Sequence, residues 1–117
     1  MIVLALAGAG ALGAPCRYLL ETAITGRAGH RFPWGTACVN LLGSLALGLL
    51  VGLREFHGLN RDLLTVGGIG FLGAFTTFST FAVETTIITP RLRVLYVAVS
   101  VAGGIALAGT GLALASL

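Results

Sequence analysis

Phenyl and hydroxyl side chains crowd into residues 70–81, which read Gly-Phe-Leu-Gly-Ala-Phe-Thr-Thr-Phe-Ser-Thr-Phe. This segment holds four of the six Phe in the protein, together with three Thr and one Ser. It lies inside a stretch that is apolar enough to cross a membrane, where every unsatisfied polar group is costly. We therefore expect the segment to face protein, water or an ion, and not lipid.

This segment could bind either a cation or an anion. Four glycines that weaken helix propensity lie just before or among its first residues: Gly67, Gly68, Gly70 and Gly73. A helix break there would free backbone carbonyls, which favour a cation such as Na⁺. Phenyl rings turned edge-on would instead stabilise an anion, because the ring edge is positive. The alternative interpretation is a packing stripe of four rings at helical spacing: Phe71, Phe75, Phe78 and Phe81.

A second set of small and polar residues recurs at every fourth position of another apolar stretch: Thr36, Asn40, Ser44, Gly48 and Gly52. Such spacing lets helix backbones approach closely, either within one chain or across a dimer seam. Asn40 stands apart, because an amide at mid-membrane depth needs a specific partner. Its NH₂ group could also donate to an anion.

The elements that position these residues are predicted to be membrane helices. The 117-residue chain forms one domain, residues 1–117, and is 56% hydrophobic and 9% charged, with a mean hydropathy of +1.00. Soluble domains are roughly a quarter charged. Four apolar stretches each approach the ~20 residues that span a bilayer: 1–23, 34–53, 63–88 and 92–117. The sequence therefore predicts an all-α membrane protein with four transmembrane helices, the third of them broken.

The distribution of charged residues gives little indication of how the chain is oriented in the membrane. All seven basic residues are Arg, and they are too scattered for a nucleic-acid surface. With four spans, Arg54 and Arg61 share the side of the two termini. The other side carries four: Arg27, Arg31, Arg91 and Arg93. This small excess is compatible with insertion in either orientation. Four helices are also too few to enclose a pore, so we expect the chain to associate.

Four motifs in order resemble the small fluoride channels called Fluc or CrcB. The first is Gly-Ala-Leu-Gly-Ala-Pro-Cys-Arg-Tyr at 10–18, and the second is Phe-Pro-Trp-Gly-Thr-Ala-Cys-Val-Asn-Leu-Leu-Gly-Ser at 32–44. The third is residues 70–81 followed by Glu84, and the fourth is Tyr96 with Ser100. The resemblance covers nearly the whole chain.

The resemblance implies a passive fluoride channel in a prokaryotic plasma membrane, which exports fluoride from the cytoplasm and limits its toxicity. Family members are antiparallel dimers inserted in both orientations, with two fluoride pathways built from both subunits. An identical chain and a paralogue are both possible partners, and membrane lipid surrounds the pair. The chain has no phosphate-binding loop, so no ATP-driven step is expected.

The resemblance also assigns roles to individual residues. It implies that the ring edges of Phe78 and Phe81 line the ion path and that Asn40 is the pore asparagine. A polar track follows on or near that path: Thr36, Thr77, Ser79, Thr80, Tyr96 and Ser100. Backbone carbonyls of Gly73 and Thr76, from both subunits, would hold a structural Na⁺. Arg17 would stand in the vestibule and raise the local anion concentration.

Several positions depart from the family pattern. Ala9 stands where a glycine is usual, and Pro15 is expected to interrupt the first helix. The loop at 89–91 is short, and Gly104 lacks the hydroxyl that some members carry one turn after Ser100.

Three other classes of protein fit the sequence less well. A small multidrug exporter, also a four-helix dual-topology protein, needs a mid-span carboxylate to titrate. Glu21 and Glu84 both lie toward the helix ends. A non-transporting assembly subunit has no need of the polar cluster at 70–81. An enzyme is not expected, because His30 and His57 are isolated loop residues without a nucleophile or metal partner.

Overall fold

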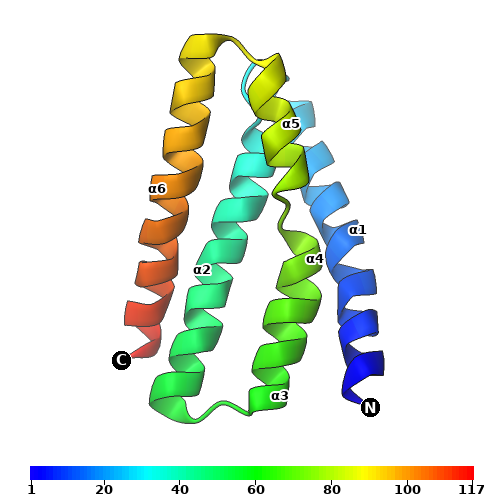
Figure 1. The fold of residues 1–117 in the computed structure, drawn as a ribbon, viewed down its shortest axis with the longest axis vertical. Coiled ribbons are helices and arrows are strands. Elements are labelled where there is room, and N and C mark those ends of the chain that lie inside the picture. Colours follow the sequence, from blue (N-terminus) through cyan, green and yellow to red (C-terminus); the bar gives the residue numbers. More distant parts are fainter.

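The computed structural model describes residues 1–117, and every regular element in it is helical. The first two spans are α1 (Ile2–Ala28) and α2 (Trp34–His57), and the last is α6 (Pro90–Ala115). The third is assembled from four pieces: α3 (Arg61–Leu64), η1 (Thr65–Leu72), α4 (Gly73–Phe75) and α5 (Ser79–Ile87). All four spans are long and apolar enough to cross a membrane, and the third is bent, as predicted (Figure 1).

The first two helices run further than the apolar stretches predict. α1 extends past Arg27 to Ala28, and α2 extends past Arg54 to His57. Gly29 and Gly58 follow these ends with φ of 84° and 68°, which glycine adopts without steric cost. His57, predicted to lie in a loop, is therefore the last residue of α2. Its Nε2 lies 2.6 Å from the carbonyl oxygen of Ala115 near the end of α6.

α1 passes through Pro15 without ending, so the prediction that this residue interrupts the first helix is wrong. Proline has no N–H and deprives the carbonyl of Ala11 of its helical hydrogen bond. Membrane helices tolerate this loss, because neighbouring groups can satisfy the freed carbonyl.

α2 packs most extensively on α6, through glycines that bring the two backbones together. A Cβ at Gly48 would collide with the Ala108 carbonyl, and one at Gly52 would lie 2.5 Å from the Ala115 methyl. The two glycines of the fourth-residue stripe on α2 therefore serve packing within the chain. Packing within one chain is one of the two interpretations of this stripe that the sequence left open, the other being a dimer seam.

The third span lies between α1 and α2 (Figure 1). Its backbone approaches that of α1 about as closely as α2 approaches α6. A Cβ at Gly13 would strike the Phe71 carbonyl. A Cβ at Gly70 would lie 2.9 Å from the Ala9 methyl, so Gly70 makes room for the alanine that replaces a usual glycine. Residues 65–72 form a π-helix, which often marks a functional site in a longer helix.

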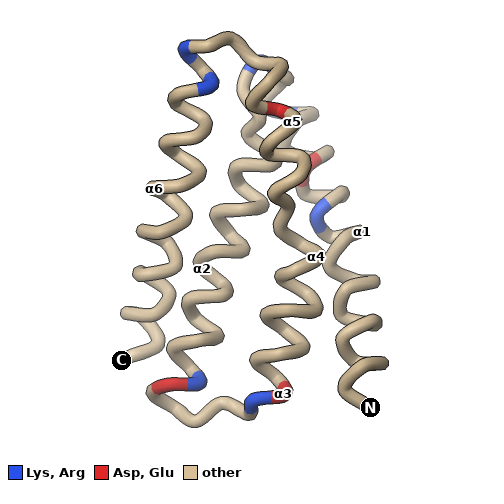
Figure 2. The backbone as a smooth tube through the Cα atoms, viewed as in Figure 1, with Lys and Arg blue, Asp and Glu red and all other residues tan.

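The charged residues gather toward the two ends of the helices (Figure 2). Arg54 and Arg61 flank the connection between α2 and α3, at the end where both termini lie. Between the ends, the helices carry almost entirely uncharged side chains. The exception is the upper half of α1, which carries Arg17 and Glu21.

Candidate functional site

A reciprocal pair of hydrogen bonds between Asn40 and Thr77 fixes the break in the third span. The Asn40 Nδ2 donates to the Thr77 carbonyl and the Thr77 N–H donates to the Asn40 Oδ1, both at 2.8 Å. Thr76 has an extended backbone, with φ −83° and ψ 162°, which separates α4 from α5. The specific partner expected for Asn40 is therefore the backbone at the break. One of its two amide hydrogens remains available.

Two carbonyls at the break have lost their helical donors. The N–H of Thr77, which would reach the Gly73 carbonyl in a regular helix, donates to Asn40. The N–H of Thr80, which would reach the Thr76 carbonyl, donates instead to the Thr77 Oγ1 at 3.1 Å. Carbonyl oxygens freed in this way suit a hard cation such as Na⁺. The Gly73 carbonyl thus fits the ion that the family resemblance implies, whereas the Thr76 carbonyl accepts a hydrogen bond from Arg17.

Arg17 reaches the same break from α1. Its Nη1 donates to the Thr76 carbonyl at 3.4 Å, and the side chain is half-buried. The guanidinium therefore lies beside the polar residues of the break. Glu21, one turn further along α1, has an Oε1 that is buried and has no hydrogen-bond partner.

An open groove of about 420 Å³ runs between α2, the third span and α6. Its polar wall is made by Asn40, Ser44, Thr76, Thr77 and Ser100. The rings of Phe78 and Phe81 also line it, with centroids 5.9 Å apart and planes inclined by 45°. Phe78 is 78% exposed, so its ring stands on the open side of the groove.

Ser100 supplies an unused hydroxyl to this groove, because its Oγ is buried and has no hydrogen-bond partner. Ser44, by contrast, donates to the Asn40 carbonyl at 3.0 Å. Gly104 faces Ser44, and a Cβ added to it would lie 3.3 Å from the Ser44 Oγ. Ser44 thus places a hydroxyl beside Gly104, which itself has none.

The remaining residues of the predicted polar track lie around the groove and not in its wall. Thr36 is buried at 4% exposure, and Ser79 lies on α5 with its Oγ 3.3 Å from that of Thr77. Thr80 joins the break through its backbone N–H. Tyr96 is fully buried, so a direct contact with an ion in the groove would require movement.

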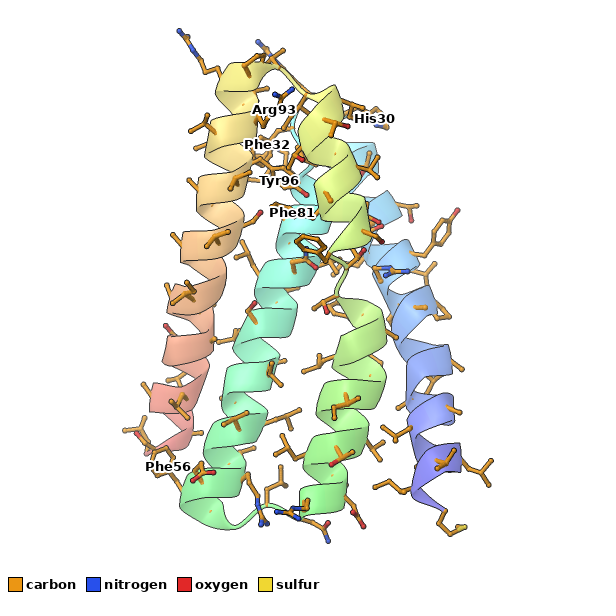
Figure 3. The ribbon with its side chains drawn as sticks, in the orientation of Figure 1. His30, Phe32, Phe56, Phe81, Arg93 and Tyr96 are labelled. Carbon is orange, nitrogen blue, oxygen red and sulfur yellow. The ribbon has the colours of Figure 1, made fainter.

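Tyr96 packs behind the groove. Its hydroxyl donates to Glu84 Oε1 at 3.1 Å, and its ring centroid lies 5.0 Å from that of Phe81. On its other side the ring meets Phe32 edge-on, at 5.5 Å and 82°. Figure 3 shows Phe32, Tyr96 and Phe81 following one another near the α5–α6 end. Sequence reasoning did not place Phe32 or Ser44 at the site, although Ser44 belongs to the fourth-residue stripe that contains Asn40.

Comparison with known protein families identifies the family of this chain. A family model described as "CrcB-like protein, Camphor Resistance (CrcB)" matches residues 4–112. The chain belongs to the CrcB family. With four helices able to span a membrane, this CrcB protein is a multi-pass membrane protein.

Relatives of the chain carry a more specific name. A fluoride-specific ion channel of Sphingopyxis alaskensis is 42% identical over 110 residues, which cover 90% of this chain and 87% of the relative. Channels of the same name from Nocardia farcinica and Symbiobacterium thermophilum are 51% and 55% identical over 84 and 78 residues. These shorter matches cover 72% and 65% of this chain, and 56% and 63% of the relatives, less than two thirds of their length.

Proposed function

We propose that this protein is a fluoride channel whose ion path follows the groove between α2, the third span and α6. The observation that carries the proposal is the meeting of five predicted pathway residues in one groove: Asn40, Thr77, Phe78, Phe81 and Ser100. Relatives named as fluoride-specific ion channels supply the identity of the ion.

Fluoride is small and strongly hydrated, so a pore must replace its lost water with donors at close range. The unused amide hydrogen of Asn40 and the unpartnered hydroxyl of Ser100 are such donors. The edges of Phe78 and Phe81 add positive potential without a full charge that would trap the ion. Chloride is larger and more weakly hydrated, and it would be excluded where the path is narrow.

The open side of the groove supports association with a second chain. A polar wall within a membrane span cannot be left facing lipid, because hydrocarbon offers its groups no hydrogen bonds. We therefore propose a dimer in which each chain covers the groove of the other, and in which lipid surrounds the pair. The weak charge bias between the two ends is compatible with an antiparallel arrangement. An identical chain is the simplest partner, and a paralogue inserted the other way would serve as well.

A structural Na⁺ at the centre of that dimer is part of the proposal. The carbonyls of Gly73 and Thr76 lack helical donors, and those of two chains together would provide four oxygens. The ion would hold the two helix breaks in register. Arg17, beside Thr76, would then fix that carbonyl and draw anions toward the groove.

In the cell, we propose passive export across a prokaryotic plasma membrane. Hydrogen fluoride enters as a neutral weak acid and dissociates in the cytoplasm, so fluoride accumulates and leaves down its own gradient. The experiment that tests this role is growth of a bacterium lacking its own fluoride exporter, with this chain expressed, in acidic medium containing fluoride. Growth with a low cytoplasmic fluoride content is expected. Unrelieved sensitivity, with the chain present in the membrane, would contradict the proposal.

A further inference from the structure

Buried side chains contribute little to holding the short helix α5 in place. None of its nine residues is buried, although it carries Phe81 of the groove. Its position therefore depends on a few polar contacts. The Thr77 hydroxyl accepts from the N–H of Thr80 at the start of α5, and the Tyr96 hydroxyl donates to Glu84 in its middle.

The end of α5 is held by one arginine of α6. Arg93 Nε donates to the Thr85 carbonyl at 2.5 Å, and its Nη2 donates to the Ile88 carbonyl at 3.3 Å. The last carbonyls of a helix have no intrahelical donor, and a basic side chain can satisfy them. The backbone N–H of Arg93 is itself bonded to the Thr89 carbonyl at 2.8 Å, in the first turn of α6. Arg93 thus links the end of α5 to the start of α6.

This link bears on the groove because of helical spacing. Thr85 lies four residues after Phe81, so the two residues share one face of α5. α5 meets α6 at both levels, through the Phe81 ring on Tyr96 and through the Thr85 carbonyl on Arg93. Figure 3 shows Arg93, Tyr96 and Phe81 at successive levels of the molecule. A rotation of α5 would therefore break the Arg93 contacts and move the Phe81 ring together.

We infer that Arg93 is a positioning residue for the fluoride groove, which sets the place of the Phe81 ring by anchoring the end of α5 on α6. The inference rests on the proposed function, since it assigns Arg93 to the same groove. The competing explanation is that Arg93 attracts anions by its charge alone, because its side chain is exposed.

Two substitutions separate geometry from charge. Arg93→Lys keeps the charge but loses the planar fork that reaches two carbonyls, and Arg93→Gln loses both. Arg91→Lys is the matched control, because Arg91 is exposed two residues earlier and its side chain makes no hydrogen bond. In liposomes, both Arg93 variants should slow fluoride efflux by roughly tenfold, in keeping with small misplacements of a site. The Arg91→Lys rate should match that of the parent. Loss in Arg93→Gln alone would assign a charge role and overturn the inference.

A second readout follows the ring itself and requires no transport. With 4-fluorophenylalanine at position 81, in detergent without fluoride, the ¹⁹F resonance of Arg93→Lys should shift or split, and that of Arg91→Lys should not. Both variants should elute as the same assembly as the parent. An unchanged resonance, or a changed one with undiminished flux, would overturn the positioning role. If the parent chain carries no fluoride, the proposed function fails while the resonance still decides whether Arg93 positions Phe81.

Discussion

At the scale of single residues, Asn40 combines two tasks in one amide. Its oxygen and one N–H hold the backbone of Thr77, while its second N–H is free to face the groove. A carboxylate of the same shape would keep the acceptor but lose both donors. In the proposed function, Asn40 would therefore link the shape of the helix break to the chemistry of the ion path.

Asn40→Asp should reduce fluoride flux by about a hundredfold or more, because like charges 4 Å apart repel by about 4 kcal/mol near a protein surface. Fluoride efflux from liposomes measures the effect. Asn60→Asp, in the exposed cap of α3, is the control and should retain the parent rate. Equal rates for the two variants would remove Asn40 from the ion path.

The sequence predicted that Asn40 would have a specific partner, and this is confirmed. It did not predict which partner, because the Thr77 backbone is available only after the third helix has broken. The unused hydroxyl of Ser100 likewise depends on how α2 and α6 approach, whereas Ser44 donates to the carbonyl four residues earlier in its own helix. Tyr96 is the opposite case. The family resemblance implies a position near the ion path, whereas in the structure Tyr96 is buried behind Phe81.

At the scale of helices, close backbone contacts hold the groove walls in place. α2 and α6 meet at Gly48, Gly52 and Gly111, where an added Cβ would overlap backbone or methyl atoms of the facing helix. α1 and the third span meet in the same way at Gly13 and Gly70. These contacts have little freedom to adjust, because backbone atoms cannot move without shifting a helix.

Gly48→Ala should lower the free energy of unfolding by about 1–3 kcal/mol, the usual penalty for overpacking. Gly109→Ala is a matched control on α6, because an added Cβ there meets nothing within 4 Å. Unfolding by increasing fractions of sodium dodecyl sulfate in mixed micelles measures both variants. The prediction fails if Gly48→Ala is as stable as Gly109→Ala.

The four spans and the break in the third were predictable, because length, apolarity and clustered glycines are local properties of the sequence. The π-helix at 65–72 and the passage of α1 through Pro15 were not predicted, since neither has a local signal that separates it from a regular or an interrupted helix. The ends of α1 and α2 also lie further along the chain than predicted, because charged residues can continue a helix into the interface.

At the scale of the whole molecule, the two ends differ by only two arginines. Arg54 and Arg61 mark the end with the termini, and four arginines lie in the first and third connections or beside them. If the chain inserts in both orientations, a small change in the number of arginines at one end should shift the ratio of the two orientations. Replacing both Arg54 and Arg61 by Gln should leave nearly all chains with the first and third connections in the cytoplasm.

Reporter fusions after Leu117 measure that shift, with a fluorescent protein active in the cytoplasm and alkaline phosphatase active outside. The parent chain should give both signals, and the double variant should give alkaline phosphatase activity alone. Arg91→Gln with Arg93→Gln is the reciprocal control, which leaves two arginines at each end and should raise the fluorescent signal relative to the parent. A parent chain with a single orientation would contradict the antiparallel homodimer.

The central claim is that fluoride passes along the groove by the edges of Phe78 and Phe81. Phe78→Ile and Phe81→Ile keep apolar volume but remove the ring edge, and Phe56→Ile, at the far end of α2, is the matched control. Efflux from liposomes that contain only the purified chain, followed with a fluoride electrode and with chloride tested in parallel, is the most direct measurement.

The parent chain and Phe56→Ile should release fluoride and retain chloride. Both groove variants should remain assembled and should lose about tenfold in fluoride rate, a barrier increase of about 1.4 kcal/mol. No fluoride efflux from the folded parent chain, or equal rates in all four proteins, would contradict this account.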